Sequence, residues 1–143
     1  MAIVYFDASA FVKLVVEEDG SDLAAALWDG CDAALSSRLA YPEVCAALAA
    51  AGRNRQIDEG DLRSAQRSWE GFWAATRPVE LTERVGRRAG VLARAHGLRG
   101  ADAVHLASAL AVGDPAIVVA VWDQQLSAGA HAERLRIAPA ARP

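Results

Sequence analysis

The chain opens with Ile3-Val4-Tyr5-Phe6-Asp7-Ala8-Ser9, an apolar run that ends on an aspartate and leads into a helical pattern. A short run of apolar residues without alternation is typical of a strand buried on both faces of a parallel sheet. Apolar residues then recur at helical spacing from Phe11 to Val15, and Ser9 is the expected N-cap of that helix. A buried strand followed directly by a helix is the repeating unit of an α/β fold.

The same unit recurs near the other end of the chain. There, Ala116-Ile-Val-Val-Ala-Val-Trp-Asp123 is the clearest strand and again ends on an aspartate. Further strands are expected at residues 33–35, 78–81 and 135–137, and further helices at residues 21–28, from a cap at Ser36 or Ser37 to Gly52, and at residues 58–76, 82–96, 100–110 and 124–130. This alternation predicts a three-layer α/β/α fold with a central, mainly parallel sheet. The chain has 143 residues, 53% of them hydrophobic, and we expect residues 1–143 to form a single domain.

Four carboxylates stand where a predicted strand ends or a predicted helix begins: Asp7, Glu43, Asp102 and Asp123. In an open parallel sheet, residues at such junctions converge on the crevice at the carboxyl ends of the strands, even when they are far apart in sequence. Two unit charges about 4 Å apart repel by roughly 4 kcal/mol at an effective dielectric constant near 20, so such a cluster needs protons or a hard cation. Carboxylate oxygens suit Mg²⁺ and Mn²⁺, and the sequence therefore predicts a site for one of these metals.

The charge of the chain bears on its partners. A net charge of −3 argues by itself against a polyanionic partner such as RNA. Without the four candidate site acids, however, 14 of the 18 acidic residues remain against 15 basic ones, so a metal-loaded site would attract a polyanion. All but one of the basic residues are arginine, whose planar guanidinium matches phosphate geometry better than lysine does.

Other features bear on compartment and on zinc. Cys31 and Cys45 form no CxxC pair and have no histidine at ligand spacing, so we expect two free thiols in a reducing cytosol and no zinc site. The N-terminus reaches a charge at Asp7 without a basic region, which argues against a secretory signal. The alanine-rich run at residues 46–51 is too short to span a bilayer, and we expect a soluble, cytoplasmic protein with no membrane contact.

Two features each allow two interpretations. Trp69, Phe72 and Trp73 recur at helical spacing, which suits either a core stripe or a surface for a dimer or another partner. His105 lies one turn beyond Asp102 on the same helix face. We expect His105 to be a packed, hydrogen-bonded helix residue and not a metal ligand.

Four motifs occur in order along the chain: Asp7-Ala-Ser-Ala-Phe-Val-Lys-Leu, Ser36-Ser-Arg-Leu-Ala-Tyr-Pro-Glu43, Gly100-Ala-Asp-Ala-Val-His-Leu-Ala-Ser-Ala-Leu and Trp122-Asp-Gln-Gln-Leu. Together they resemble the successive motifs of the PIN-domain nucleases. Within that superfamily, the chain is most similar to the VapC toxins of bacterial toxin–antitoxin pairs. Each motif alone is unspecific, but their order and spacing are specific, and the resemblance covers nearly the whole chain.

The resemblance implies an RNA endonuclease that depends on Mg²⁺ or Mn²⁺ and cleaves structured RNA such as tRNA or rRNA. It implies Ser9 as a supporting polar group and, as catalytic and metal-binding acids, Asp7, Glu43, Asp102 and Asp123. In such a site, a carboxylate-bound metal lowers the pKa of its bound water and stabilises the leaving oxygen at phosphorus. One departure is Val121, because the family commonly has Thr or Ser two residues before the last acid, and a hydroxyl that could support the metal site is missing here.

The resemblance also implies a homodimer and inhibition by a small cognate antitoxin, whose tail would lie across hydrophobic helices and cover the acidic pocket. Aromatic candidates for these surfaces are Trp28, Trp69, Phe72 and Trp73.

Three other classes deserve comparison. A response-regulator receiver domain needs a lysine at the end of a late strand, but the only lysine is Lys13, early in the chain. A phosphatase of the haloacid-dehalogenase type needs a second aspartate two residues after the nucleophile, where Ser9 stands. The remaining alternative is a non-catalytic, nuclease-like module that binds RNA or protein, and the presence of all four acids argues against it.

Overall fold

The computed structural model describes residues 1–140, which form five strands and seven helices. The strands are β1 (Ile3–Phe6), β2 (Ala33–Ser37), β3 (Arg77–Val79), β4 (Val118–Ala120) and β5 (Arg136–Ala138). The helices are α1 (Ala8–Val15), α2 (Ser21–Gly30), α3 (Ala40–Arg53), α4 (Glu59–Ala74), α5 (Glu83–His96), α6 (Gly100–Ala111) and α7 (Gln124–Ala132).

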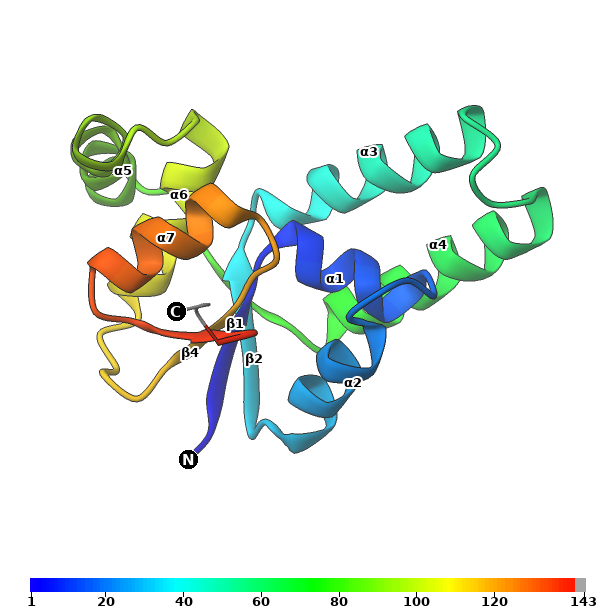
Figure 1. Cartoon of the computed structure of the whole chain (residues 1–143), viewed down its shortest axis with the longest axis horizontal. Coiled ribbons are helices and arrows are strands. Elements are labelled where there is room, and N and C mark those ends of the chain that lie inside the picture. The colour runs from blue at the N-terminus through cyan, green and yellow to red at the C-terminus, as the bar shows by residue number, and fades with distance from the viewer. Residues whose placement is uncertain (141–143) are drawn as a thin grey trace.

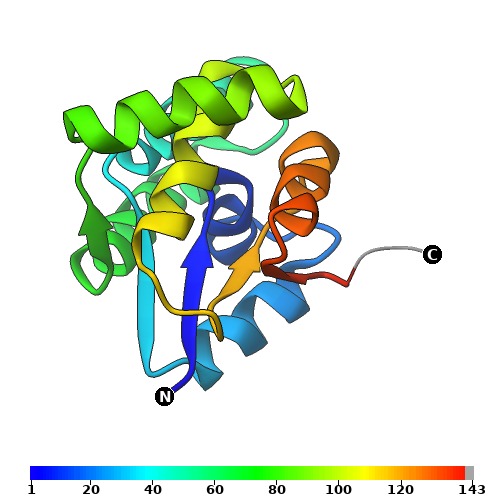
Figure 2. The ribbon, with the colours of Figure 1, turned by 90° about the vertical axis from the view of Figure 1, so that its left-hand side faces the viewer.

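The strands form one sheet in the order β3-β2-β1-β4-β5, and every neighbouring pair is parallel. Parallel neighbours need crossover connections, which the helices supply on both faces of the sheet. This confirms the expected three-layer α/β/α fold. Because all the strands point the same way, they end at the same edge of the sheet (Figure 2). Asp7 directly follows β1, the central strand, and so lies at the middle of that edge.

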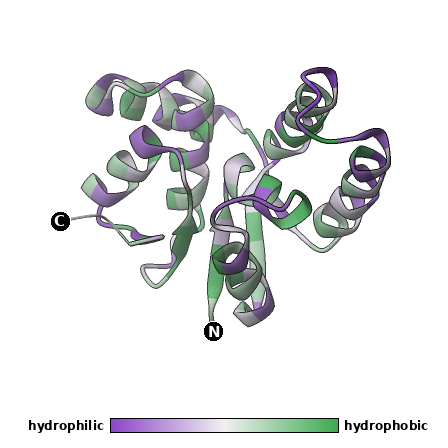
Figure 3. Ribbon diagram, turned by 45° about the vertical axis from the view of Figure 1, so that its right-hand side comes forward, coloured by the Kyte–Doolittle hydropathy of each residue, from purple (hydrophilic) through white to green (hydrophobic). Residues whose placement is uncertain are grey.

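The two helical layers pack against opposite faces of β1, whose side chains alternate in direction. Val4 and Phe6 belong to a core shared with α1 to α4, whereas Tyr5 belongs to a core shared with α5, α6 and α7. Figure 1 shows the first group, with its long α3–α4 hairpin, on one side of the sheet and the second group on the other. Apolar residues concentrate along the strands and hydrophilic residues along outer helix faces and connections (Figure 3).

Several helix ends lie where the sequence predicts them. Asp58 caps α4 by accepting a hydrogen bond from the Asp61 amide, and Thr82 caps α5 by accepting one from the Val85 amide. Gly97 ends α5 in the left-handed region, with φ of 63°, a conformation that glycine adopts without steric penalty.

Three local predictions were wrong. Ser9 lies inside α1 and does not cap it, because Asp7 takes the capping hydrogen bond from the Ala10 amide. Ser36 and Ser37 are the last residues of β2 and not helix caps: the Ser36 hydroxyl donates to the Phe6 carbonyl oxygen at 2.5 Å, which ties β2 to β1.

The third wrong prediction concerns the strand expected at residues 116–123, because only Val118–Ala120 pair as β4. The partner strand sets this limit. The last pair between β1 and β4 is Phe6 with Ala120, and the chain beyond Phe6 turns into α1. The predicted strands at residues 78–81 and 135–137 are each displaced, to Arg77–Val79 and Arg136–Ala138.

The aromatic residues of α4 belong mainly to the core. Trp69 is 1% exposed, and Phe72 and Trp73 are partly buried against the same core cluster. The core interpretation therefore holds for Trp69, and the two other rings extend that core toward the surface.

Two expectations about the bulk of the chain can be compared with the structure. Cys31 and Cys45 are both free thiols. Among the helices formed by residues 1–140, none combines the length and the apolar character that crossing a membrane requires.

Candidate active site at the carboxyl edge of the sheet

Asp7 is a buried carboxylate at the end of the central strand. Its Oδ1 accepts hydrogen bonds from the Ser9 hydroxyl at 2.6 Å and from the Ala10 amide at 3.0 Å, and the residue is only 4% exposed. Burial raises the pKa of Asp7 to about 6, while nearby His105 lowers it and Glu43 raises it. A carboxylate in this environment gains from a proton or a cation at its other oxygen.

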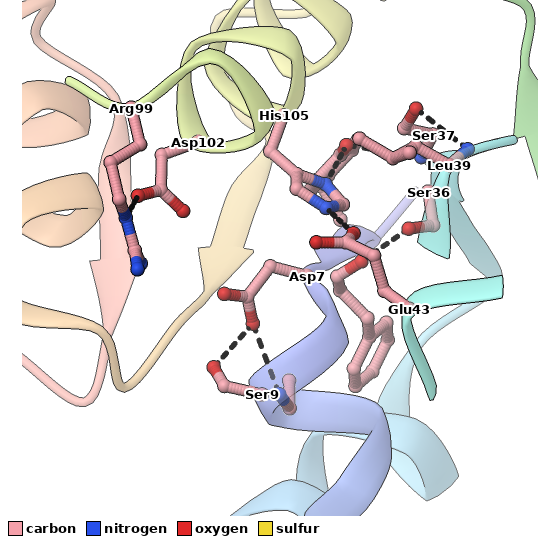
Figure 4. Close-up of polar contacts among 12 residues, drawn as sticks. Asp7, Ser9, Ser36, Ser37, Leu39, Glu43, Arg99, Asp102 and His105 are labelled. Atoms are coloured by element: carbon pink, nitrogen blue, oxygen red, sulfur yellow. Dashed lines mark hydrogen bonds and ion pairs between the residues drawn. The ribbon is translucent and has the colours of Figure 1, made fainter. Parts of the chain in front are cut away.

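Glu43 lies in the first turn of α3 and is held by a histidine from the opposite helical layer. The Glu43 Oε1 and His105 Nε2 atoms are 2.6 Å apart, and His105 Nδ1 is 2.7 Å from the Tyr5 hydroxyl oxygen. The His105 side chain is 3% exposed and that of Glu43 is 28% exposed, so one end of this hydrogen-bonded chain is buried and the other reaches the surface. Figure 4 shows the contact between Glu43 and His105.

Asp102 lies in the first turn of α6 and pairs with an arginine that precedes the helix. Arg99 Nε donates to Asp102 Oδ2 at 3.1 Å, and the Arg99 side chain is 76% exposed. The Asp102 carboxylate raises the pKa of Arg99, and Asp123 and Glu43 add to this effect at longer range. A solvent-accessible guanidinium thus lies within electrostatic reach of three of the four candidate acids.

Asp123 precedes α7, where its side chain makes no capping hydrogen bond, and its Oδ2 is buried without a hydrogen-bond partner among residues 1–140. The neighbouring Trp122 amide donates to the Ser9 hydroxyl at 3.2 Å. Ser9 therefore links the ends of β1 and β4, next to two of the acids. The preceding residue, Val121, is 1% exposed and is fixed by its amide, which donates to the Ala138 carbonyl oxygen.

The structure brings the candidate acids to one edge but not into one compact cluster. Asp7 and Glu43 both lie near His105, and the Arg99–Asp102 pair lies on the other side of Asp7 in the view of Figure 4. Within the part of the chain that the structure describes, no group of three Asp, Glu, His or Cys side chains is placed to hold a metal ion.

The chemistry of these side chains nevertheless fits a hard divalent cation. The orphaned Oδ2 of Asp123 is a buried carboxylate oxygen without a donor, and both hydrogen bonds accepted by Asp7 go to Oδ1 alone. An unpaired buried carboxylate oxygen is unfavourable unless a proton or cation compensates it. All the candidate donors are carboxylate oxygens, the ligands that suit Mg²⁺ and Mn²⁺.

Sequence reasoning missed two residues of this site. The sequence did contain a signal for Arg99, because a basic residue three positions before Asp102 lies on the same helix face. Tyr5 had none, because its place in a short apolar run predicts only burial. His105 is packed and hydrogen-bonded as expected, but its link to Glu43 depends on the approach of α6 to α3 across the sheet edge.

Comparisons with known proteins give a consistent result. A family model described as the PIN domain matches residues 4–123. Two proteins of Mycobacterium tuberculosis are each 73% identical over 140 residues, covering 98% of this chain and 97% of the relative: ribonuclease VapC45 of strain CDC 1551 / Oshkosh and ribonuclease VapC49 of strain ATCC 25618 / H37Rv.

Solved structures agree on the fold. The crystal structure of Mycobacterium tuberculosis VapC20, described as a sarcin–ricin loop cleaving toxin, has a TM-score of 0.66 at 18% identity and covers 87% of this chain and 93% of its own. The crystal structure of PAE2754 from Pyrobaculum aerophilum has a TM-score of 0.63 at 21% identity and covers 97% of this chain and 93% of its own.

Proposed function

The chain belongs to the PIN domain family, and we propose from this premise that it is a metal-dependent endoribonuclease, the toxin of a type II toxin–antitoxin pair. The observation that carries the proposal is the 73% identity, over nearly the whole length, to two proteins named VapC ribonucleases. The buried, unpaired carboxylate oxygen of Asp123 and the buried Asp7 support it, because both suit a cation-binding site.

In this proposal, the metal ligands are the four candidate acids, Asp7, Glu43, Asp102 and Asp123. Bound Mg²⁺, or alternatively Mn²⁺, would lower the pKa of a water molecule for attack on a phosphodiester and stabilise the leaving oxygen. Ser9 fixes one oxygen of Asp7 by donating to it and fixes the end of β4 by accepting from Trp122.

Arg99 is suited to the RNA backbone. Its guanidinium is largely exposed, yet it lies beside Asp102 at the acidic edge, where a scissile phosphate would have to approach. A guanidinium binds phosphate oxygens through two parallel N–H donors. We propose that Arg99 exchanges its contact with Asp102 for a phosphate when RNA binds, which would leave the Asp102 carboxylate available to hold the metal.

The substrate and the protein partners follow from the relatives. VapC20 is described as cleaving the sarcin–ricin loop, which supports a structured RNA of the rRNA or tRNA class as the substrate here. We further propose a cognate small antitoxin as inhibitor, because the relatives named VapC imply a toxin–antitoxin pair. A homodimer as the functional state is proposed from the resemblance to the VapC toxins alone. Candidate contacts are the partly buried Trp28, Phe72 and Trp73.

The test is cleavage of total cellular RNA by the purified full chain, freed of any co-purified antitoxin, with Mn²⁺ or with a chelator. We expect cleavage only with metal, and a loss of at least about 100-fold in rate for Asp7→Asn and Asp102→Asn, in the range that removal of electrostatic or metal-binding groups produces. Asp29→Asn, at an exposed site on α2, is the matched control and should cleave like wild type.

Two outcomes would contradict the proposal. Equal cleavage by wild type and both acid variants would assign the activity to a contaminant or to other residues. RNA binding without cleavage, across rRNA and tRNA substrates and with metal present, would favour the non-catalytic binding module.

A further inference from the structure

The carboxylate of Glu43 is at the end of a hydrogen-bonded chain that begins in the core. Tyr5 lies in β1 and is completely buried, and its hydroxyl oxygen accepts a hydrogen bond from the Ser37 amide at 3.0 Å. The same hydroxyl is 2.7 Å from His105 Nδ1, and His105 Nε2 is 2.6 Å from Glu43 Oε1. Two strands and two helices, β1, β2, α3 and α6, therefore contribute to fixing one carboxylate.

The partners in this chain determine the position of each proton. Since the Ser37 amide can only donate, the Tyr5 hydroxyl accepts there and keeps its own proton for another acceptor. His105 Nδ1 is one acceptor within reach, and the Ser36 and Ser108 hydroxyls also lie beside the Tyr5 oxygen. Burial raises the pKa of Tyr5, which keeps this hydroxyl protonated. The Glu43 carboxylate can only accept, so His105 Nε2 carries a proton and donates it to Oε1.

His105 differs from an ordinary buried histidine in its position and in its hydrogen bonds. His105 fills a position between the core and the acidic edge, and both of its ring nitrogens are used. A rigid aromatic hydroxyl behind it fixes the plane of the ring, since the Tyr5 and His105 rings meet edge to face with centroids 5.8 Å apart. The ring in turn fixes Glu43 Oε1 and leaves Oε2 for another partner.

We propose that His105 is a positioning residue, held in place by Tyr5, that donates from Nε2 to Glu43 and orients this carboxylate for metal binding without itself being a ligand. This inference rests on the proposed function, since it assigns Glu43 to the metal. Outer residues that orient a ligand in this way typically change metal affinity by roughly 10–100-fold when they are replaced.

The chain offers a matched control for His105. His96 Nε2 lies 2.7 Å from Glu133 Oε2, a second histidine–glutamate pair with nearly the same separation, located between the ends of α5 and α7. Tyr41 is the corresponding control for Tyr5, because its hydroxyl donates to Glu70 at 2.5 Å on an exposed face. His96→Leu removes an imidazole and Tyr41→Phe removes a phenol hydroxyl, as the corresponding substitutions of His105 and Tyr5 do. Neither control residue belongs to the hydrogen-bonded chain from Tyr5 to Glu43.

The experiment measures Mn²⁺ affinity by calorimetry on the full chain, together with a thermal melt of each variant. His105→Leu should weaken Mn²⁺ binding roughly tenfold. His105→Gln, which keeps an N–H donor near the position of Nε2, should retain the wild-type affinity, as should His96→Leu. Equal losses for His105→Leu and His105→Gln, or no loss for either, would overturn the positioning role.

A second measurement does not depend on the metal. Long-range ¹H–¹⁵N correlation spectra of the metal-free protein should show a proton on His105 Nε2. Tyr5→Phe should shift the His105 ring resonances and weaken Mn²⁺ binding, whereas Tyr41→Phe should do neither. If His105→Leu fails to fold, Tyr5→Phe carries the test, because it keeps the ring and removes one oxygen.

Mn²⁺ binding by the wild-type protein distinguishes a wrong role for His105 from a wrong proposed function. An unprotonated His105 Nε2 in a wild-type protein that binds Mn²⁺ would overturn the inference alone. A wild-type protein that binds no Mn²⁺ would overturn the metal-dependent function and, with it, the role of His105.

Discussion

Two regions that share β1 differ in their contribution to stability. One is the acidic edge, formed by Asp7, Glu43, Asp102 and Asp123. The other is the aromatic cluster, formed by Phe6, Phe11, Trp28, Tyr41, Trp69, Phe72 and Trp73, whose ring centroids lie 4.8–6.5 Å apart, within the range that aromatic pairs prefer.

The electrostatic state of the two regions explains the difference. Asp7 is buried with a raised pKa, and Asp123 Oδ2 is buried without a partner in residues 1–140. The unpartnered atom of the aromatic cluster is a neutral indole nitrogen, that of Trp69. Unfavourable buried charge is typical of functional sites and rare elsewhere. The aromatic cluster therefore stabilises the fold, whereas the acidic edge destabilises the metal-free protein.

A substitution in the aromatic cluster should lower the free energy of unfolding more than any other considered below. Trp69→Ala removes a fully buried ring that contacts Phe11, Tyr41 and Trp73, and should lower the free energy of unfolding by about 3–5 kcal/mol. Trp73→Ala, at a half-buried position, should lower the free energy of unfolding by less. Urea titration followed by circular dichroism measures both, and a cost below about 1 kcal/mol for Trp69→Ala would refute the core assignment.

Asp7→Asn should change the stability in the opposite direction and raise the free energy of unfolding of the metal-free protein. Asparagine keeps an oxygen that can accept from Ser9 and Ala10 but carries no charge. The pKa shift of Asp7 from 3.8 to about 6 corresponds to roughly 3 kcal/mol, so in chelator at pH 7 this variant should be more stable than wild type by up to about that amount.

The pH dependence of the stability gained by Asp7→Asn follows from the direction in which the pKa of Asp7 is shifted. Since the folded-state pKa is raised, the protonated Asp7 stabilises wild type below pH 3.8, and this stability is lost as the pH rises through about 6. The advantage of Asp7→Asn should therefore appear between pH 4 and 6. Thermal melts in chelator at pH 4 and pH 7 check this, and equal differences at the two pH values would contradict it.

Ser9→Ala is expected to have the smallest effect on stability. It removes the hydroxyl that donates to Asp7 and accepts from the Trp122 amide, at a cost of about 1 kcal/mol. Because the Ser9 hydrogen bond lowers the pKa of Asp7, its loss should raise that pKa further. Ser9→Thr keeps the hydroxyl and is the control. If Ser9→Ala and Ser9→Thr have the same stability, the hydroxyl does not link the two strand ends.

Much of the fold could be predicted because its signals are local. The apolar run before Asp7, the cap at Thr82 and the stop at Gly97 each depend on a few neighbouring residues, and the structure has all of them. The errors arose where a distant partner decides. The strand expected at residues 116–123 is short because β1 ends opposite Ala120, and Ser9 is not a cap because Asp7 serves that role while Ser9 bonds to Trp122.

The order of strands and helices and the four acids at their junctions can be inferred from the amino-acid sequence alone. A residue's type and its place in a hydrophobic pattern are enough for both. The partners of those acids depend on the three-dimensional fold: Glu43 with His105 and Tyr5, Asp102 with Arg99, and Asp7 with Ser9. Hydrogen bonds act over about 3 Å, and such distances between elements far apart in sequence are set by the packing of helices on the sheet.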